Sequence, residues 1–591
     1  MLQTFFSKTE RIVPGPPPST EGDEESLDVW GFHDTRFQIN PRGHVELTGK
    51  RYLFCGQELS SFLPWVEGMM EVRIDPKDLF SSHYPTLLPE SVLHEGYLKE
   101  VRQILKVDQI ATDPEIRLRH GHGHTQAEMF AIKYGKLGRI PDLVVFPTEE
   151  SQVETLVAAA IRHDVCLIPY GGGTSVTEAL RCPENERRMI VSVDMKRMNR
   201  ILWIDRVNRM ACIEAGAVGR HLMEQLAFHG FTLGHEPDSV EFSTLGGWIA
   251  THASGMKKNR YGNIEDIVID MNIVTPGGKI TLSPLSPRES IGIDPRVWMF
   301  GSEGNFGIVT SAVVKLFPLP EVQSYGSVIF PTFEEGVAFM YELTQKGRPP
   351  ASIRLVDNVQ FQFGLSLKPK STGLKALKSR LEKFYVVRLR GFDPHQMVAC
   401  TIVFEGDRSE VKEQEREVYR IAKRHRGLPA GSENGKRGYQ LTYGIAYIRD
   451  FVMNHHVLAE SFETSMPWSQ VLSLCENVKK RLHEEHQRRR LPGKPFVSCR
   501  VTQVYETGVC VYFYFGFYFK GVENPSQVYA EMEEAARDEI LRSGGSLSHH
   551  HGIGKIRQGF LPRVKSPAAL TWIRDAKKAL DPKNVFGCGN Q

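Results

Sequence analysis

Two glycine clusters are the features of this sequence best suited to holding a phosphate-bearing group. The first, Pro169–Ser175, follows the apolar run 165–168 and contains three consecutive glycines. Without Cβ atoms, the backbone N–H groups of such a turn can close around a pyrophosphate, and the hydroxyls of Thr174 and Ser175 can bind the same oxygens. The second cluster, Gly301–Gly307, lies before another β-rich run. Together they predict a large cofactor with two phosphates, although an ordinary tight turn is the alternative for either cluster alone.

The spacing of the first cluster argues against a nicotinamide cofactor. A Rossmann unit opens its helix with the pattern G-x-G-x-x-G, which places the pyrophosphate at the helix N-terminus. The run Gly171–Gly173 does not have that spacing. The turn therefore gives only weak support to a nicotinamide-binding domain.

An aromatic strand and a run of histidines carry groups suited to proton transfer. In the stretch 511–519, a period of two places Tyr512, Tyr514 and Tyr518 on one face and apolar side chains on the other. A phenol has a pKa near 10, so a cationic or imidazole neighbour would have to lower that pKa before the phenol could act as a base at neutral pH. The run His549–His551 could supply such a neighbour, the alternative being a surface loop. Three adjacent histidines cannot easily all reach one ion, so no metal site is predicted.

The composition describes a soluble globular chain. Its 591 residues are 41% hydrophobic and 24% charged, which predicts two to four domains. The net charge of +3 comes from mixed acidic and basic residues, so nothing argues for nucleic acid as a partner. The nine cysteines are scattered without a C-x-x-C pair, which predicts no disulfide framework. No apolar run reaches the roughly 18 residues that span a bilayer.

The periodicity of the apolar residues predicts two successive α+β regions. Between about 140 and 320, short strands at 143–147, 189–193, 211–215 and 267–274 alternate with helices such as 219–228. Beyond 320, long strands alternate with long charged helices, and Asn524-Pro525 begins a helix that runs to about Arg542. The elements that must position the candidate residues are predicted at 408–424, 469–490, 511–519 and 568–580.

The order of these features resembles the flavin-binding domain of the vanillyl-alcohol oxidase and p-cresol methylhydroxylase family. The signature is the GGGTS loop followed by GHEPDS, TLGG, ASG and YG. Outside that segment, the strings IRLVDN, YIRD, CRVTQ, YFYF and GGSLSHHHGIGK resemble the branch of the family that makes the ether bond of ether lipids. The resemblance runs from Trp30 to Asn584. It implies an α+β fold, with a two-subdomain FAD-binding domain and an α+β cap domain for the substrate.

Composition and the pattern of elements set the expected boundaries. The proline-rich stretch 14–18 and the acidic stretch 21–25 can bury little surface, which predicts a disordered tail at 1–27. An N-terminal segment follows at 28–139. With the resemblance, 140–320 is expected to be the FAD-binding domain, 321–560 the cap, and 561–591 a C-terminal segment that returns to the active site.

The cofactor implied by the resemblance is FAD held without a covalent bond. The family usually has an arginine where this chain has His252, which puts one polar contact in question. The residues expected around FAD are Pro169, Tyr170, Gly171, Gly172, Gly173, Thr174, Ser175, Asp238, Ser239, Val240, Glu241, Phe242, Ser243, Thr244, Thr251, His252, Ala253, Ser254, Gly301, Ser302, Glu303, Gly304, Asn305, Phe306 and Gly307.

Catalytic roles also come from the resemblance. Tyr512 matches the family's acid/base tyrosine, and His550, with His549 and His551, lies in the catalytic loop expected beside it. Arg354 matches an arginine essential to activity, and His235 is expected near the isoalloxazine. Arg449 matches the arginine that binds the substrate phosphate, a role suited to a planar fork of donors. For either arginine alone, a structural ion pair is the alternative.

The implied reaction is the exchange of the acyl group of acyl-dihydroxyacetone phosphate for a long-chain fatty alcohol. It has no net redox change, and the family is thought to carry it out through an adduct at flavin N5. The alternative is an FAD-dependent dehydrogenase or oxidase of a 2-hydroxy acid, because the same fold serves such enzymes. The resemblance further implies a homodimer in peripheral contact with the peroxisomal membrane. The C-terminal Cys588-Gly589-Asn590-Gln591 is not a peroxisomal address of the S-K-L type.

Overall fold

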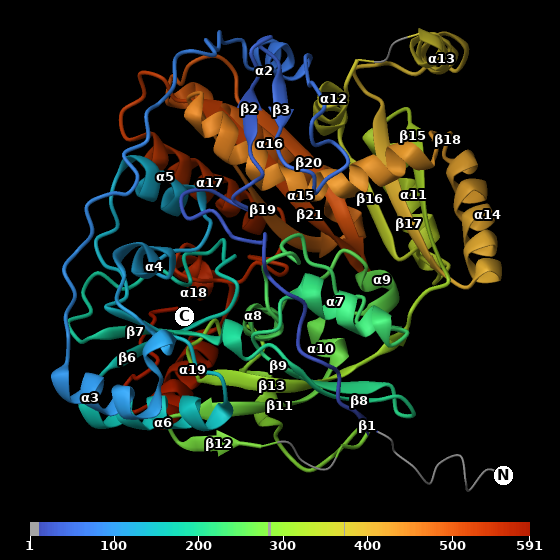
Figure 1. Cartoon of the computed structure of the whole chain (residues 1–591). Helices are drawn as coiled ribbons and strands as arrows, with labels where there is room; N and C mark the ends of the chain where they lie inside the picture. Colours follow the sequence, from blue (N-terminus) through green and yellow to red (C-terminus); the bar gives the residue numbers. More distant parts are fainter. Residues whose placement is uncertain (1–10, 282–284, 371–372, 591) are drawn as a thin grey trace, which may run out of the picture. The chain divides into compact units, whose positions relative to one another are not determined.

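A computed structural model describes residues 11–281, 285–370 and 373–590 of the chain (Figure 1). The chain divides into two compact units, and each is assembled from separate stretches of sequence. The first unit comprises residues 1–20, 83–319 and 550–591, and the second comprises residues 21–82 and 320–549. Each unit is described on its own below.

The first unit contains two main sheets that share one helix. The six-stranded sheet is antiparallel, with the order β1-β8-β9-β13-β11-β12, and the four-stranded sheet has the order β4-β5-β7-β6, in which β5, β7 and β6 are parallel. Helix α6 (Glu150–His163) contacts strands of both sheets. The strands are β1 (Arg11–Ile12), β4 (Ile110–Ala111), β5 (Leu143–Val145), β6 (Cys166–Tyr170), β7 (Ile190–Asp194), β8 (Ile201–Asp205), β9 (Met210–Glu214), β11 (Val268–Thr275), β12 (Gly278–Ile280) and β13 (Ile308–Lys315), with β10 (Phe231–Thr232) and β14 (Phe317–Pro318) forming a separate pair.

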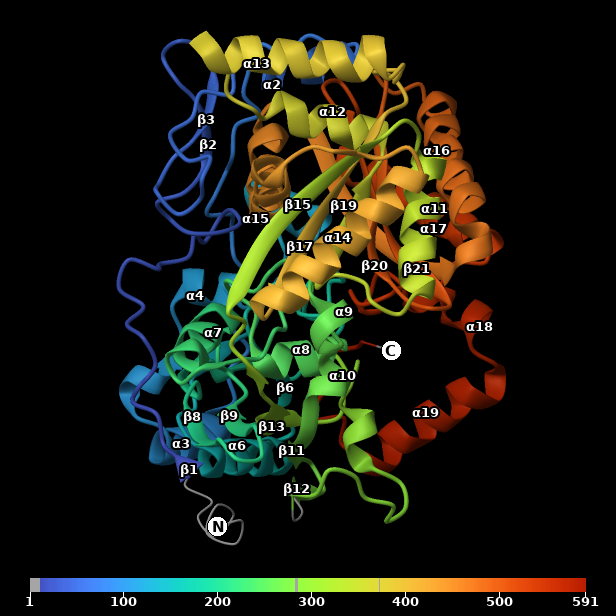
Figure 2. The same ribbon diagram turned by 90° about the vertical axis from the view of Figure 1, so that its right-hand side faces the viewer.

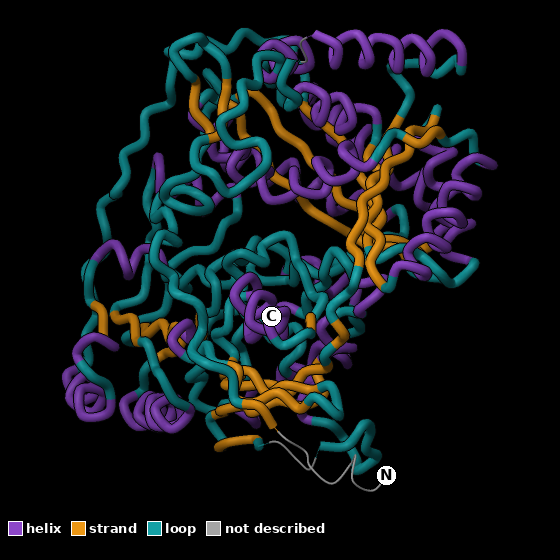
Figure 3. The backbone as a smooth tube through the Cα atoms, turned by 45° about the vertical axis from the view of Figure 1, so that its right-hand side comes forward, coloured by secondary structure: helices purple, strands orange, loops and turns teal. Residues whose placement is uncertain are grey.

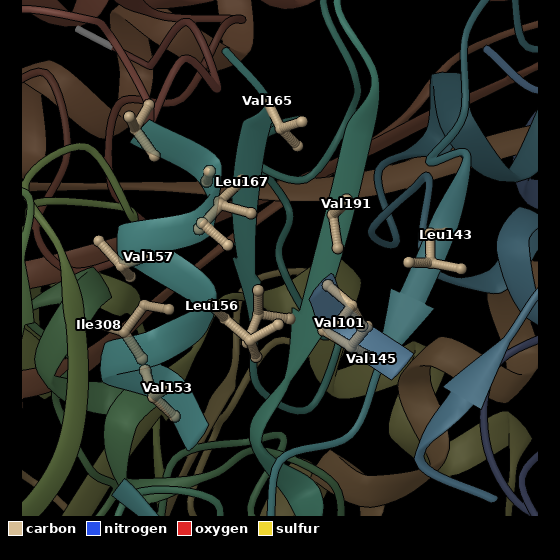
Figure 4. Packing of buried hydrophobic residues seen from close by; sticks show 14 of the residues in the cluster. Val101, Leu143, Val145, Val153, Leu156, Val157, Val165, Leu167, Val191 and Ile308 are labelled. Atoms are coloured by element: carbon tan, nitrogen blue, oxygen red, sulfur yellow. The ribbon is translucent and has the colours of Figure 1, made fainter. Parts of the chain in front are cut away.

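The core of the four-stranded sheet follows from the apolar spacing of α6. Val153, Leu156 and Val157 recur at i, i+3 and i+4, so they lie on one face of the helix. Figure 4 shows Leu156 turned toward the strands that carry Leu167 and Val191, and Val153 and Val157 on the side of the helix toward Ile308. Fully burying one such side chain contributes about 1.5–3 kcal/mol. Strand β5 is apolar throughout, β7 is apolar apart from Ser192 and Asp194, and both strands are fully buried because both of their faces are covered.

Among the described residues of the first unit, α6 and α19 (Pro567–Leu580) have 14 residues each, and the other helices have ten or fewer. These others are α3 (Glu95–Ile104), α4 (Pro114–Arg119), α5 (Gln126–Tyr134), α7 (Gly219–Phe228), α8 (Leu245–Thr251), α9 (Lys258–Tyr261), α10 (Ile264–Ile267) and α18 (Leu561–Val564).

Strand β1 differs from the predicted disordered tail at residues 1–27. Arg11 and Ile12 pair with Asp205 and Ile204 at the edge of the six-stranded sheet, and the Arg11 guanidinium lies 4.1 Å from the ring centre of Trp203. An open sheet edge offers backbone hydrogen bonds that composition alone does not reveal. Residues 1–10 of the predicted tail lie outside the described residues.

The second unit is built on a seven-stranded antiparallel sheet with the order β18-β15-β17-β16-β20-β21-β19. Helix α15 (Ser432–Asn454) contacts β15, β17 and β19, and Figure 2 shows α11, α14, α16 and α17 around the same sheet. Residues 37–74 pack against the C-terminal half of α15 and complete the core. The strands are β2 (Phe37–Ile39), β3 (Val45–Leu47), β15 (Val322–Phe330), β16 (Ser352–Val356), β17 (Val398–Gly406), β18 (Leu428–Pro429), β19 (Val457–Pro467), β20 (Phe496–Val504) and β21 (Gly508–Tyr518).

The helices of the second unit include the longest of the described chain. No helix within the described ranges is both long and apolar enough to cross a bilayer. The remaining ones are α2 (Phe62–Met70), α11 (Phe333–Gln345), α12 (Asn358–Ser366), α13 (Gly373–Phe384), α14 (Arg408–Arg424), α16 (Val471–Arg488) and α17 (Pro525–Arg542).

Candidate functional site

The loops that carry the predicted cofactor residues pack directly on one another in the first unit. A Cβ atom at Gly172 would overlap the carbonyl oxygen of Phe242, so the glycine turn passes the second loop too closely for any side chain. Gly304, at a φ of 83°, lies against Pro169 at the start of the same turn. The structure therefore brings the segments 169–175, 238–244 and 301–307 together, as a common ligand would require.

Several polar side chains in these loops already bond within the protein. The Ser254 hydroxyl donates to the Asn263 side-chain oxygen at 2.7 Å, and the Ser243 hydroxyl accepts the indole N–H of Trp248 at 2.8 Å. These hydroxyls fix the loop conformation. Contact with a phosphate is then left mainly to the backbone N–H groups of the turns.

The side chain of Glu303 connects two loops of the first unit. Its buried carboxylate accepts hydrogen bonds from Thr177 Oγ1 at 3.1 Å, from Gly554 N at 2.8 Å and from Ile553 N at 3.3 Å. Burial raises the pKa of the Glu303 carboxyl, and these three donors oppose that effect. Glu303 thus ties the second glycine cluster to the segment that follows the histidine run.

His252 occupies the position where the family usually has an arginine. It ends α8 in the left-handed region, at a φ of 53°, and its Nε2 lies 3.2 Å from Glu265 Oε2. The bond to Glu265 raises the pKa of His252, and partial burial opposes the rise. The imidazole is therefore engaged by a carboxylate of its own unit.

Three buried polar groups near these loops have no hydrogen-bond partner among the described residues. They are both ring nitrogens of His235, Nε2 of His122, and the hydroxyl of Ser302. His235 is 0% exposed, and its ring centre lies 4.8 Å from that of Trp248. Burial lowers its pKa to about 3, with a smaller contribution from the nearby His550, so the ring is neutral at physiological pH.

His122 is a further candidate, which the sequence analysis does not assign. Its Nδ1 lies 2.6 Å from the Gly123 carbonyl oxygen, and Gly123 itself leaves no room for a Cβ beside the Ser175 carbonyl. The loop of His122 therefore joins the glycine turn. The pattern R-H-G-H-G-H-T, with glycines between histidines, was the signal available in the sequence.

On the second unit, the sheet places three ionisable side chains in one row. Tyr512 of β21 is the cross-strand neighbour of Arg500 on β20 and of Glu463 on β19. The Arg500 guanidinium lies 4.7 Å from the ring centre of Tyr512 and 5.2 Å from that of Tyr514. All of these side chains are buried. Arg500 is thus the cation beside the phenol that sequence reasoning required but did not assign.

His549 joins this row through Glu463. The Glu463 carboxylate accepts the backbone N–H of His549 and the Ser548 hydroxyl, the latter at 2.7 Å. His549 Nε2 lies 2.7 Å from the hydroxyl of Tyr505. The Cys510 sulfur and a His549 ring nitrogen lie within 4.8 Å of each other, an arrangement of two metal-ligand types that sequence reasoning did not foresee.

The histidine run crosses the boundary between the units. His549 belongs to the second unit, with Tyr512, whereas His550 and His551 belong to the first. The His550 and His551 rings lie 4.8 Å apart, and His550 contributes to the electrostatics of His235. The pairing of His550 with Tyr512 stays a prediction.

Arg354 shares a sheet face with Tyr512. It lies on β16, two positions before Val356, the neighbour of Arg500, so the alternation of the strand places its side chain on the same face as that of Arg500. Its guanidinium donates to the Thr442 hydroxyl of α15 and lies 5.5 Å from the ring centre of Tyr439. The predicted essential arginine is therefore buried beneath α15.

Arg449 forms a buried ion triad. Its Nε lies 2.9 Å from Asp450 Oδ1, and its Nη1 lies 3.0 Å from Glu460 Oε2. Burial disfavours the charge, but the two carboxylates outweigh it and raise the pKa of Arg449. Glu460 on β19 is the cross-strand neighbour of Phe515 on β21. Its side chain therefore lies on one face of the sheet and that of Tyr512 on the other. The structure does not bring Arg449 and Tyr512 together, and the phosphate-binding role stays a prediction.

Comparison with known proteins covers nearly the whole chain. The family described as "FAD binding domain" matches residues 141–283, and "FAD linked oxidases, C-terminal domain" matches residues 319–590. An alkyldihydroxyacetonephosphate synthase of Caenorhabditis elegans is 45% identical over 95% of this chain and 94% of its own. A crystal structure of an alkyldihydroxyacetonephosphate synthase superposes with a TM-score of 0.82 at 29% identity, covering 96% of this chain and 99% of that one.

This chain belongs to the alkyldihydroxyacetonephosphate synthase family. It is an FAD-dependent enzyme of ether-lipid biosynthesis, which confirms the predicted function class and cofactor. The predicted α+β fold of the vanillyl-alcohol oxidase type is confirmed as well. The alternative, a 2-hydroxy-acid dehydrogenase, is supported less well: a mitochondrial D-lactate dehydrogenase of Arabidopsis thaliana is 24% identical over 83% of this chain and 79% of its own.

The residues of the first unit fit FAD, the cofactor of this synthase family. The unpartnered nitrogens of His235 and His122 and the hydroxyl of Ser302 can bond a cofactor rich in hydroxyls and ring nitrogens. The glycine turn Pro169–Ser175 offers backbone N–H groups to a pyrophosphate. These residues would hold FAD, whereas Glu303 and His252 are engaged by the protein.

Because the His235 imidazole has no partner within the protein, its replacement is expected to affect stability and FAD affinity differently. Replacing His235 by phenylalanine is expected to leave the flavin-free protein as stable as before or more stable, because no hydrogen bond within the protein is lost. The affinity for FAD is expected to fall about tenfold, the loss of roughly one hydrogen bond. Thermal unfolding of the apo-protein and a flavin titration measure the two effects. His229→Phe, at a partly exposed position, is the control, and equal losses of affinity in both variants would contradict the role of His235.

The ion triad of Arg449 gives a second prediction. In Arg449→Met, the buried carboxylates of Asp450 and Glu460 lose their cation, so the free energy of unfolding is expected to fall by about 3–5 kcal/mol. Urea unfolding measures the loss, and adding Glu460→Gln should recover part of it. A variant that raises the KM for the phosphate-bearing substrate at unchanged stability would show instead that the arginine serves the substrate alone.

Proposed function

We propose that this enzyme replaces the acyl group of acyl-dihydroxyacetone phosphate by a long-chain fatty alcohol, releasing a fatty acid. The observation that carries the proposal is the row formed by Tyr512, Arg500 and Glu463, with Arg354 on the same sheet face. A phenol beside buried guanidinium groups suits proton transfer on a substrate that bears an anionic phosphate. When bound, FAD supplies the covalent catalysis that lets an alcohol take the place of a carboxylate.

Each side chain has a distinct part in this proposal. Tyr512 removes and returns the proton at the carbon that carries the acyl oxygen, and Arg500 favours the phenolate electrostatically. Arg354, on the same sheet face as Tyr512, orients the phosphate in this proposal. A role of Arg449 in binding the phosphate rests on the resemblance alone. The neutral His235 serves the flavin as a hydrogen-bonding group, since its pKa of about 3 keeps it uncharged.

The test uses the purified holoenzyme under argon with palmitoyl-dihydroxyacetone phosphate and labelled hexadecanol. Labelled alkyl ether is expected without any electron acceptor, because the exchange has no net redox change. If no ether forms, and a 2-hydroxy acid bleaches the flavin while an acceptor dye restores its colour, the enzyme is a dehydrogenase and the proposal fails.

The cofactor is bound without a covalent link in this proposal, and the enzyme works in the peroxisome against the inner face of the membrane. Both statements rest on the resemblance to the flavoprotein family. Acid precipitation should leave all flavin in the supernatant, and a fluorescent fusion should coincide with a peroxisomal marker.

We also propose a homodimer formed through the first unit. Exposed apolar side chains there support it. Ile293 is 90% exposed, Val297 is 65% exposed, and Trp572, whose ring centre lies 5.1 Å from that of Trp298, is 64% exposed. Apolar side chains gathered on a surface mark association sites. Sedimentation velocity should show a dimer that Trp572→Asp weakens.

A further inference from the structure

We propose that residues 373–391, the basic apolar helix of the second unit, form the surface by which this enzyme binds an anionic phospholipid bilayer. The proposal rests on the proposed function, because lipid substrates place the enzyme at a membrane. It assigns that contact to one segment, which comprises α13 and the π-helical turn Tyr385–Leu389 that continues it.

The first argument is a row of exposed apolar side chains. Leu377, Leu381 and Phe384 recur at i, i+4 and i+7, so they share one face of α13, and they are 55%, 61% and 56% exposed. Tyr385 and Leu389 of the continuing turn are 47% and 67% exposed. A helix that belonged to the core would bury such a stripe. An exposed stripe instead indicates a surface that binds a partner.

The position of the helix agrees with this use. Figures 2 and 3 show α13 running along the outside of the second unit, away from the seven-stranded sheet. The described side chains of residues 380–385 are all exposed. The helix can therefore lie flat on a planar surface, with its exposed apolar row in contact with that surface.

The positive charge of residues 373–391 favours an anionic partner. Between residues 373 and 391 the sequence has six basic residues and a single acidic one, Glu382. This excess of positive charge is larger than that of the whole chain, which is +3. Arg380 and Lys383 are exposed next to the apolar row. Apolar side chains flanked by lysine and arginine are the pattern of an interfacial helix on anionic lipid.

A second copy of the chain fits the segment less well than a bilayer. In a two-fold dimer the same patch meets itself, so the basic residues of the two copies would face one another. An anionic bilayer instead neutralises the basic residues and accepts the apolar row together. The copy-to-copy contact is therefore treated as a result that would overturn the proposal.

The test is sedimentation of the holoenzyme with sucrose-loaded vesicles. Vesicles of phosphatidylcholine with about 30% phosphatidylserine should bind the enzyme more tightly than phosphatidylcholine alone, and high salt should weaken binding. The variant Leu381→Asp/Phe384→Asp is expected to lose affinity by more than about tenfold, and Arg380→Glu/Lys383→Glu by a similar factor with a smaller salt dependence. Phe228→Asp is the matched control, because Phe228 is 87% exposed on the first unit, and it should bind as the wild type does.

Two further readouts keep the test decisive. All variants should form ether at the wild-type rate from substrates dispersed in detergent, which separates a loss of membrane binding from a failure of the proposed function or of folding. A bimane probe on Leu381→Cys should shift to the blue with anionic vesicles, and one on Phe228→Cys should not. Unchanged vesicle binding by Leu381→Asp/Phe384→Asp overturns the proposal, and so does a loss of dimer in that variant while vesicle binding persists.

Discussion

Replacing Tyr512 by phenylalanine is expected to slow ether formation by about 10²–10⁴-fold, the range contributed by a positioned acid/base group. Tyr512 lies between Arg500 and Glu463 in the sheet, so the substitution removes the hydroxyl and leaves the ring and the strand pairing in place. The flavin content and the unfolding midpoint should therefore match those of the wild type. Turnover of labelled hexadecanol under argon measures the effect.

Tyr514 provides the matched control for this prediction. It lies on the same face of β21, also buried, with its ring centre 6.2 Å from that of Tyr512 and 5.2 Å from the Arg500 guanidinium. Tyr514→Phe should keep most of the activity, because the acid/base role belongs to one hydroxyl. Equal losses of activity in the two variants would show that the electrostatics of both tyrosines matter, rather than one hydroxyl. An unchanged activity of Tyr512→Phe would show that Tyr512 is not the acid/base group.

Gly172→Ala is expected to produce the second large effect, the loss of bound flavin. A Cβ atom there overlaps the Phe242 carbonyl oxygen, which is backbone and cannot rotate away. The two loops must separate, at a cost of about 1–3 kcal/mol in the free energy of unfolding, typical of overpacking. The flavin absorbance per protein and the urea midpoint should both fall.

Alanine substitutions at two other glycines are the controls for Gly172→Ala. At Gly171 the added Cβ would meet the side-chain hydroxyl of Thr244 at 2.5 Å, which can move, so Gly171→Ala should be milder. Gly559 belongs to the same unit and has no atom within 4 Å of the added Cβ, so Gly559→Ala should be neutral. If Gly559→Ala were as damaging as Gly172→Ala, the close approach of the loops would not be the cause.

The sequence was sufficient to predict elements governed by local periodicity. Helices α7 and α14 begin and end at the predicted residues, and α17 begins at the proline after Asn524, because a stripe of apolar residues and a stop or start signal lie within each segment. The aromatic strand β21 was also predicted with the correct alternation. Tyr512 and Tyr514 are buried, with Ile445 of α15 and Phe496 of β20 packed against them.

The sequence was sufficient to predict which residues belong to the site, but not which side chains they contact. The glycine turns and Tyr512 stand out in the sequence because their chemistry is unusual. The pairing of Arg449 with Glu460, and the placement of Arg500 beside Tyr512, depend on strand register and on contacts between distant segments. Glu303 illustrates the same limit, since its neighbours Thr177 and Gly554 lie far from it in the chain.

The composite first unit sets the order of events during synthesis. Val585 and Phe586 are part of the core around β6, where Leu167 N donates to the Val585 carbonyl oxygen at 2.7 Å. That core cannot close until residue 586 has left the ribosome. Residues 83–319 must therefore wait, with apolar surface uncovered, while the 230 residues from 320 to 549 are made and collapse into the second unit. During this interval we expect the nascent chain to need chaperone protection. We also expect it to be sensitive to proteases between residues 83 and 319, because the first unit is completed only by residues 550–591.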